Sequence, residues 1–199
     1  MEDLGDGQRS EGPLPPLQTA GMVRAMSSAG ENILGLTLFL DTNQIGSTLK
    51  ASRFLARLHA EGCISVLVSD TVGTELDNSP ETKRDDLSSA ASQFDVVLGV
   101  MVLDHSRLDS AVLGGEADVV LMDELRQIIY PSRDWASVRR QHTRDVMHIH
   151  TAIRAGADAF VTEDHELLKR SHELIDHINV WSPREAAVEA VRRLREASS

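Results

Sequence analysis

Short apolar runs alternate with amphipathic stretches along the chain from residue 36 onward. Continuous apolar runs of this length are typical of strands that are buried on both faces of a parallel sheet. The stretches between them repeat apolar residues at helical spacing, and Gly62 and Gly156 stand where two of these helices should end. The alternation predicts an α/β fold, a three-layer α/β/α sandwich with a central parallel sheet of about five strands. The predicted strands are residues 36–40, 64–69, a run within 94–104, 158–162 and 178–181.

The helices expected between these strands differ in how clearly they are signalled. Ser79 followed by Pro80 is a typical start, an N-cap with proline in the first turn, and Pro131 is a typical end. Residues 1–30 show no periodicity and predict a polar tail, whereas 31–199 predict one domain. Residues 105–116 fit no element clearly. The predicted helices cover 49–61, 74–77, 79–93, 117–129, a segment through Trp135 and Val138, 144–155, 164–173 and 184–197.

Composition and charge restrict the class of protein. The formal net charge of −11 argues against an extended nucleic-acid-binding surface, because such surfaces displace counterions with Lys and Arg. The acidic first residues do not resemble a secretory signal, and no apolar run approaches the roughly 18 residues of a membrane span. A single cysteine, Cys63, excludes an intrachain disulfide and a zinc site made of several thiolates. A cytoplasmic protein that does not contact membranes is the resulting expectation.

Four acidic residues are expected at one edge of the predicted sheet. Asp41 follows the first strand directly, Glu75 lies just beyond the second, and Asp164 follows the fourth. Asp145 is expected to open the helix that leads into the fourth strand. Because sites of open parallel sheets form at the carboxyl ends of the strands, the four side chains should converge there.

Crowded carboxylates repel one another unless protons or cations offset their charge. Oxygen-only ligands suit Mg²⁺ or Mn²⁺, ions that can activate water for attack on a phosphodiester. The spacing therefore predicts a divalent-metal site. Each residue alone also has a plainer explanation: Asp41 and Asp164 as helix caps, Asp145 as an acid favoured by the helix dipole, and Glu75 on an exposed helix face.

The motifs that carry these acids resemble those of PIN-domain nucleases. They are "LFLDTN", "SDTVGTELD", "RDVMHIHTAIRAGADAFVTED" and "INVWSPREA", spread over residues 36–186 in the order usual for the family. The resemblance implies that Asp41, Glu75, Asp145 and Asp164 are the acidic metal-binding and catalytic residues, and that Asn43 and Thr162 support them. It also implies RNA cleavage that leaves a 5′-phosphate and a 3′-hydroxyl. Many bacterial members are toxins held inactive by an antitoxin, and homodimers are common.

The predicted function is that of a metal-dependent endoribonuclease, a hydrolase in which a metal-activated water cleaves RNA phosphodiesters. Arg139, Arg140 and Arg144 precede Asp145, and either RNA phosphates or solvent would suit them. His148 and His150 diverge on a helix, so they are not expected to share a ligand. The alternative function is a non-catalytic PIN-like module that binds RNA or a protein. An aspartyl-phosphate-forming phosphohydrolase is disfavoured, because Asn43 stands where that chemistry usually needs a second Asp.

Overall fold

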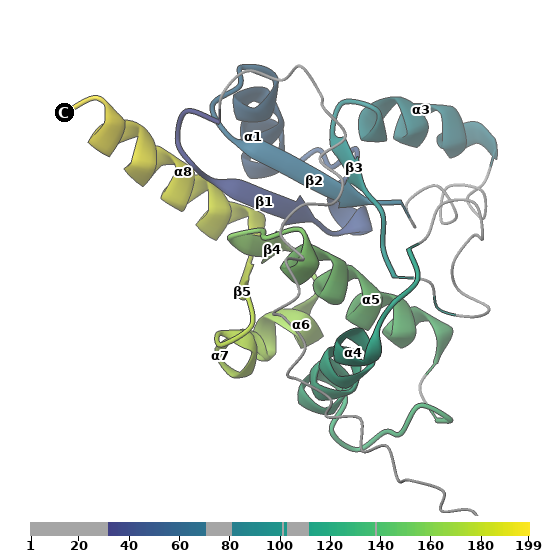
Figure 1. Ribbon diagram of the computed structural model, residues 1–199. Helices are drawn as coiled ribbons and strands as arrows, with labels where there is room; N and C mark the ends of the chain where they lie inside the picture. Colours follow the sequence, from purple (N-terminus) through teal and green to yellow (C-terminus); the bar gives the residue numbers. More distant parts are fainter. Residues whose placement is uncertain (1–31, 71–80, 101, 103–111, 138) are drawn as a thin grey trace, which may run out of the picture.

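The computed structural model describes residues 32–70, 81–100, 102, 112–137 and 139–199 (Figure 1). Five parallel strands form one sheet in the order β3-β2-β1-β4-β5. The strands are β1 (Thr37–Leu40), β2 (Ser65–Ser69), β3 (Asp95–Val97), β4 (Ala159–Val161) and β5 (Asn179–Trp181). The helical elements are η1 (Thr42–Gln44), α1 (Lys50–Ala60), α3 (Glu81–Ala91), α4 (Glu116–Ile129), α5 (Arg140–Arg154), α6 (His165–Lys169), α7 (Ser171–Leu174) and α8 (Pro183–Ala197).

Both faces of the sheet are covered by helices, as the continuous apolar strands predict. Successive side chains of a strand point to opposite faces, so Leu38 and Leu40 of β1 pack toward α1 and α8. Phe39, between them, packs on the other face and stacks with Phe160 of β4, with ring centroids 6.1 Å apart. Helices α4 to α7 cover that second face (Figure 1). The predicted three-layer α/β/α sandwich with a parallel sheet is confirmed.

Most of the predicted helix ends are close to the observed ones. Helix α1 ends at Ala60, two residues before Gly62, and α5 ends at Arg154, two residues before Gly156; the two glycines have φ 71° and φ 68°. Both glycines permit a backbone conformation that side chains disfavour. The expected tail at 1–30, the short helix at 74–77 and most of the ambiguous segment at 105–116 lie outside the described residues.

Three helix predictions need correction. The segment at Trp135 is a turn rather than a helix, because Asp134 accepts hydrogen bonds from the backbone N–H and the hydroxyl group of Ser137. Helix α5 begins at Arg140 rather than at 144. The helix expected over 164–173 is interrupted at Arg170 and forms α6 and α7.

The carboxyl edge of the sheet extends past the ends of β1 and β4. The Asp41 N–H donates to the carbonyl of Val161 at 2.9 Å, and the Thr162 N–H donates to that of Trp181 at 3.0 Å. These bonds continue the ladder by one residue on each strand. The sheet therefore fixes the backbone of Asp41 and Thr162, and with it the points from which their side chains extend. Within the described residues, no helix combines the length and apolarity that a membrane crossing requires.

Candidate metal and nucleic-acid site

Asp41 lies at the junction between β1 and the short helix η1. Its backbone is extended, with φ −65° and ψ 149°, but its side chain makes no capping hydrogen bond to η1. The plain helix-cap explanation for Asp41 is therefore wrong. Its carboxylate instead accepts a 2.6 Å hydrogen bond from the hydroxyl group of Thr162, and only 14% of the side chain is exposed.

Thr162 joins the ends of the two central strands. Its side chain is fully buried, and its hydroxyl oxygen accepts hydrogen bonds from Asn43 Nδ2 at 3.3 Å and from the Asp164 N–H at 3.0 Å. A hydroxyl group has one hydrogen and two lone pairs, so these bonds and the one to Asp41 use its whole capacity. The two predicted supporting residues, Asn43 and Thr162, thus contact each other, and Thr162 orients the Asp41 carboxylate.

Asp164 caps helix α6. Its Oδ1 accepts hydrogen bonds from the backbone N–H groups of Glu166 at 2.7 Å and Leu167 at 3.4 Å, which satisfies two donors at the helix start. The plain explanation for this residue is confirmed. The cap also fixes the carboxylate beside Thr162. Asp164 is therefore both a helix cap and a member of the acidic group.

Asp145 lies in the second turn of α5, because the helix starts earlier than predicted. Its Oδ2 accepts a 2.5 Å hydrogen bond from the hydroxyl group of Tyr130. The pKa of Asp145 is raised to about 6: burial raises it most, and the negative charges of Asp41 and Asp164 also raise it, whereas the Tyr130 hydrogen bond and the nearby His148 lower it. Three of the four predicted acids are thus close enough to repel one another. The fourth, Glu75, lies outside the described residues.

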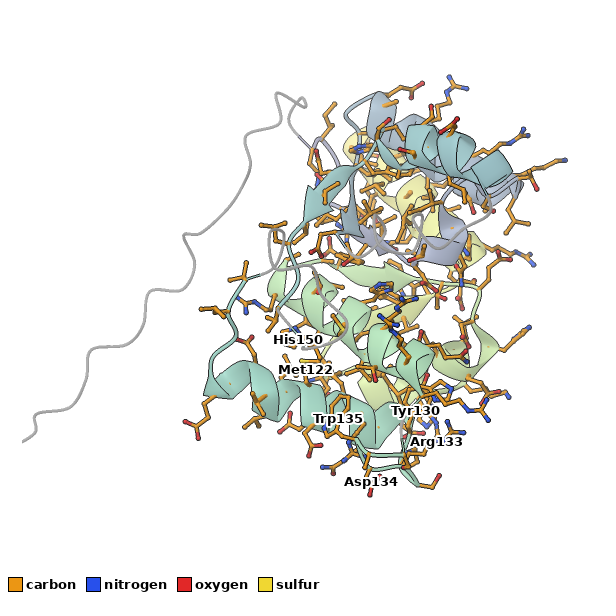
Figure 2. The ribbon with its side chains drawn as sticks, turned by 90° about the vertical axis from the view of Figure 1, so that its right-hand side faces the viewer. Met122, Tyr130, Arg133, Asp134, Trp135 and His150 are labelled. Carbon is orange, nitrogen blue, oxygen red and sulfur yellow. The ribbon has the colours of Figure 1, made fainter. Side chains whose placement is uncertain are left out.

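The two histidines of α5 face different neighbours, as the sequence predicts. His148 is buried, and its Nδ1 lies 3.7 Å from Asp41 Oδ1. His150 is also buried, but its Nε2 lies 3.2 Å from Asp118 Oδ1. Asp118 belongs to the first turn of α4, and Figure 2 shows His150 toward that end of the helix. Only His148 is therefore adjacent to the acids.

Three residues that sequence reasoning missed form a group that Tyr130 links to Asp145. The ring of Tyr130 stacks on that of His142, with centroids 4.4 Å apart. The guanidinium carbon of Arg133 lies 5.8 Å from the centroid of the Tyr130 ring, and its Nη1 lies 2.6 Å from His142 Nδ1. Figure 2 shows Tyr130 and Arg133 together at the C-terminal end of α4. Residues 130–133 carry no motif, and only the packing of the turn against α5 reveals them.

His142 is a neutral acceptor in this group. A guanidinium group has donors but no acceptor, so the nitrogen of His142 that faces Arg133 must accept the hydrogen bond. Burial lowers the pKa of His142, and the positive charges of Arg133 and Arg139 lower it further. The three arginines predicted to contact substrate belong to the start and the second turn of α5. Arg139 and Arg140 are exposed at the start of α5, and Arg144 is half-buried.

Asp41, Asp145 and Asp164 fit Mg²⁺ or Mn²⁺ in donor chemistry. All three offer carboxylate oxygen, and their mutual repulsion is the kind of unfavourable charge that a divalent cation offsets. In their present rotamers they are not a finished ligand set, since no three His, Cys, Asp or Glu side chains of the described residues stand grouped for a metal ion. One carboxylate oxygen of each Asp already accepts a hydrogen bond from within the protein.

No model of a known protein family matches the chain, and no curated protein sequence matches it either.

Proposed function

We propose that this protein is a PIN-like, metal-dependent endoribonuclease. The observation that carries the proposal is the group of Asp41, Asp145 and Asp164 at the carboxyl edge of a parallel sheet, where burial and, after it, the charges of Asp41 and Asp164 raise the pKa of Asp145. Parallel α/β folds form their sites at this edge, and groups of carboxylates with perturbed pKa values are typical of functional sites. The order of the motifs, similar to that of PIN-domain nucleases, supports the same function.

In this proposal the chain's own residues hold and orient the reacting groups. Asp41, Asp145 and Asp164, with Glu75 as the expected fourth acid, would hold Mg²⁺ or Mn²⁺. Thr162 keeps the Asp41 carboxylate in one orientation, and Asn43 keeps the Thr162 hydroxyl in place. Tyr130 does the same for Asp145. A divalent ion, when bound, supplies Lewis-acid chemistry that acidifies water and offsets charge on a phosphodiester.

Rigid positioning of the carboxylates is the protein's main contribution to such a reaction. The strand ends fix Asp41, and a helix cap fixes Asp164, so neither side chain has to be ordered when substrate binds. No side-chain nucleophile is required. An antitoxin partner and a homodimer remain proposals that rest on the resemblance alone.

The test compares wild type with Asp41→Asn on a mixed RNA pool with Mn²⁺. Loss of a residue that merely supports a metal ligand typically costs about 10- to 100-fold, so loss of a ligand should slow cleavage about 100-fold or more. Asp176→Asn is the matched control, because Asp176 is exposed on the loop between α7 and β5. The products should carry 5′-phosphates, and EDTA should abolish cleavage. Equal cleavage by wild type and Asp41→Asn would contradict the assignment.

A non-catalytic RNA-binding module is the second candidate. The use of Asp164 as a helix cap favours it, because the cap gives this carboxylate a role that needs no metal ion. RNA binding without any Mn²⁺-dependent cleavage, in protein whose fold is intact by circular dichroism, would decide for this alternative.

A further inference from the structure

The turn between α4 and α5 holds an arginine, Arg133, whose side-chain partners differ from those of the ion-paired arginines. Arg133 interacts with the neutral ring of His142 and with the face of Tyr130. Within the described part of the chain, it has no carboxylate partner. By contrast, a set of six other described arginines each form an ion pair with a carboxylate. They are Arg57, Arg126, Arg154, Arg170, Arg192 and Arg193.

We propose that Arg133, held by Tyr130 and His142, is the binding site for an RNA phosphate next to the one at the acidic group. The inference rests on the proposed function, since it assigns the contact that positions the substrate of that site. We call these three residues the Arg133 clamp.

The Arg133 side chain is fixed before any ligand binds. The backbone N–H of Arg133 donates to the carbonyl of Tyr130 at 3.0 Å, and its own carbonyl accepts from the guanidinium group of Arg126. Its side chain is held by His142 and by the Tyr130 ring. A long side chain that is already ordered loses little rotamer freedom when it binds, and the planar guanidinium group suits phosphate oxygens.

The charge of the Arg133 guanidinium is not neutralised by a carboxylate of the described residues. The group carries five N–H donors, and the clamp supplies one acceptor, the imidazole nitrogen of His142. The chain has 31 acidic against 20 basic residues, yet the two side chains that hold the Arg133 guanidinium are neutral. Arg133 is half-buried rather than enclosed, which leaves it accessible to a ligand. An anion of the phosphate class satisfies both the charge and the donors.

The Arg133 clamp is joined to the acidic group by Tyr130. Tyr130 belongs to both groups: its hydroxyl donates to Asp145, while its ring lies against Arg133 and His142. The arginine is therefore about one tyrosine side chain away from the acids. A cation at that place can hold a neighbouring phosphate of the same strand, and phosphate contacts of this kind set the register of a nucleic acid without reading its sequence. An acidic protein needs such a local contact to retain RNA.

The experiment measures binding rather than cleavage. The probe is a fluorescein-labelled, mixed-sequence single-stranded RNA with Ca²⁺ in place of Mn²⁺, followed by fluorescence anisotropy over a range of KCl concentrations. Arg133→Gln should weaken binding about tenfold and lower the slope of log K against log salt by about 0.7, the value for one phosphate contact on a single strand. Arg133→Lys keeps the charge and should keep the slope of wild type.

The matched control is Arg195→Gln, which removes the same charge from an exposed position near the end of α8, on the opposite face of the sheet. It should bind RNA with the affinity and slope of wild type. If Arg133→Gln does not fold, Arg133→Lys is the deciding variant. A reduced RNA affinity with the wild-type slope of log K against log salt supports the clamp, and a slope below that of wild type overturns it.

Failure of the clamp and failure of the nuclease proposal are distinguishable. Wild-type affinity and slope in folded Arg133→Gln, or no binding of RNA by wild type, overturns the clamp whatever the cleavage assay gives. Weakened binding by Arg133→Gln together with no Mn²⁺-dependent cleavage by wild type supports the clamp and contradicts the nuclease.

Discussion

Asp145 is a single residue whose surroundings disfavour the ionised form of its side chain. Burial and the charges of Asp41 and Asp164 disfavour its anion, while the Tyr130 hydroxyl stabilises it. The pKa of Tyr130 is raised as well. Burial raises it most, followed by the hydrogen bond to Asp145 and the negative charge of Asp145. Tyr130 therefore stays protonated and keeps donating. A carboxylate held in this way is typical of residues retained for function at a cost in stability.

Replacing Asp145 with Asn should stabilise the metal-free protein at high pH. The folded-state pKa of about 6 lies above the unfolded value of about 3.9, so the stability linked to this group is fully present below about pH 4 and is lost as the pH rises to about 6. At pH 8, Asp145→Asn should therefore gain about 1–2 kcal/mol, reduced from the full linkage value for the partial exposure of the site. The amide oxygen can still accept from Tyr130.

Urea unfolding in EDTA at pH 4, 6 and 8 measures this effect. The gain should disappear near pH 4, where the aspartic acid is itself neutral. Asp176→Asn, at an exposed position, is the control and should change stability little at any of these pH values. Destabilisation of Asp145→Asn at pH 8 would show that the carboxylate is better accommodated than its burial indicates.

At the scale of elements, the junction between β4 and α6 combines support of the fold with support of the site. The strand ends at Val161, Thr162 turns its hydroxyl toward Asp41, and Asp164 begins the helix. A helix as short as α6 depends on its cap more than on the propensity of its residues. The two roles of Asp164 can be separated, because a cap needs only an acceptor, whereas only a carboxylate also offsets the charge of a divalent cation.

Asp164→Asn and Asp164→Ala should differ in stability but not in activity. The Asn side chain keeps an acceptor for the Glu166 and Leu167 N–H groups, so its free energy of unfolding should stay within about 0.5 kcal/mol of wild type, whereas Ala should lose about 1 kcal/mol. Both should lose Mn²⁺-dependent cleavage. Urea unfolding and the RNA assay measure the two properties separately, and full activity in Asp164→Asn would leave the residue with the cap alone.

At the scale of the whole molecule, the relevant feature is the concentration of negative charge. The net charge is −11, and the described acids at the sheet edge add local repulsion to this general excess. Any salt screens the general repulsion in proportion to its ionic strength. A specific site binds the divalent ion, so the divalent ion stabilises the protein more than a monovalent salt of the same ionic strength. Thermal stability can tell these two effects apart.

Mn²⁺ should raise the melting temperature of wild type. A ligand present at about 100 times its dissociation constant stabilises the folded state by about 2.7 kcal/mol, which corresponds to about 5–10 °C for a chain of this size. KCl at matched ionic strength should give a smaller shift. Asp41→Asn should lose most of the difference between Mn²⁺ and KCl. An equal Mn²⁺ effect in the variant would place the bound ion elsewhere.

The sequence by itself determined the layers and the ends of the main elements. Continuous apolar runs such as 36–40 can be satisfied only by burial on both faces, and Gly62 and Gly156 end helices because of a local backbone property. The strand-end positions of Asp41 and Thr162 followed from the same pattern, since the edge at which parallel strands end is fixed by their direction.

Only the tertiary structure decided which side chains meet. The contact of Tyr130 with Asp145, the place of Arg133 and the start of α5 at Arg140 depend on how a turn packs against a helix. Trp135 has helical spacing to its neighbours, yet its indole donates to Asp123 of α4 and the backbone turns there. Periodicity reports which positions are buried, but it does not report which partner buries them, because contacts between elements depend on three-dimensional distances that residue order does not encode locally.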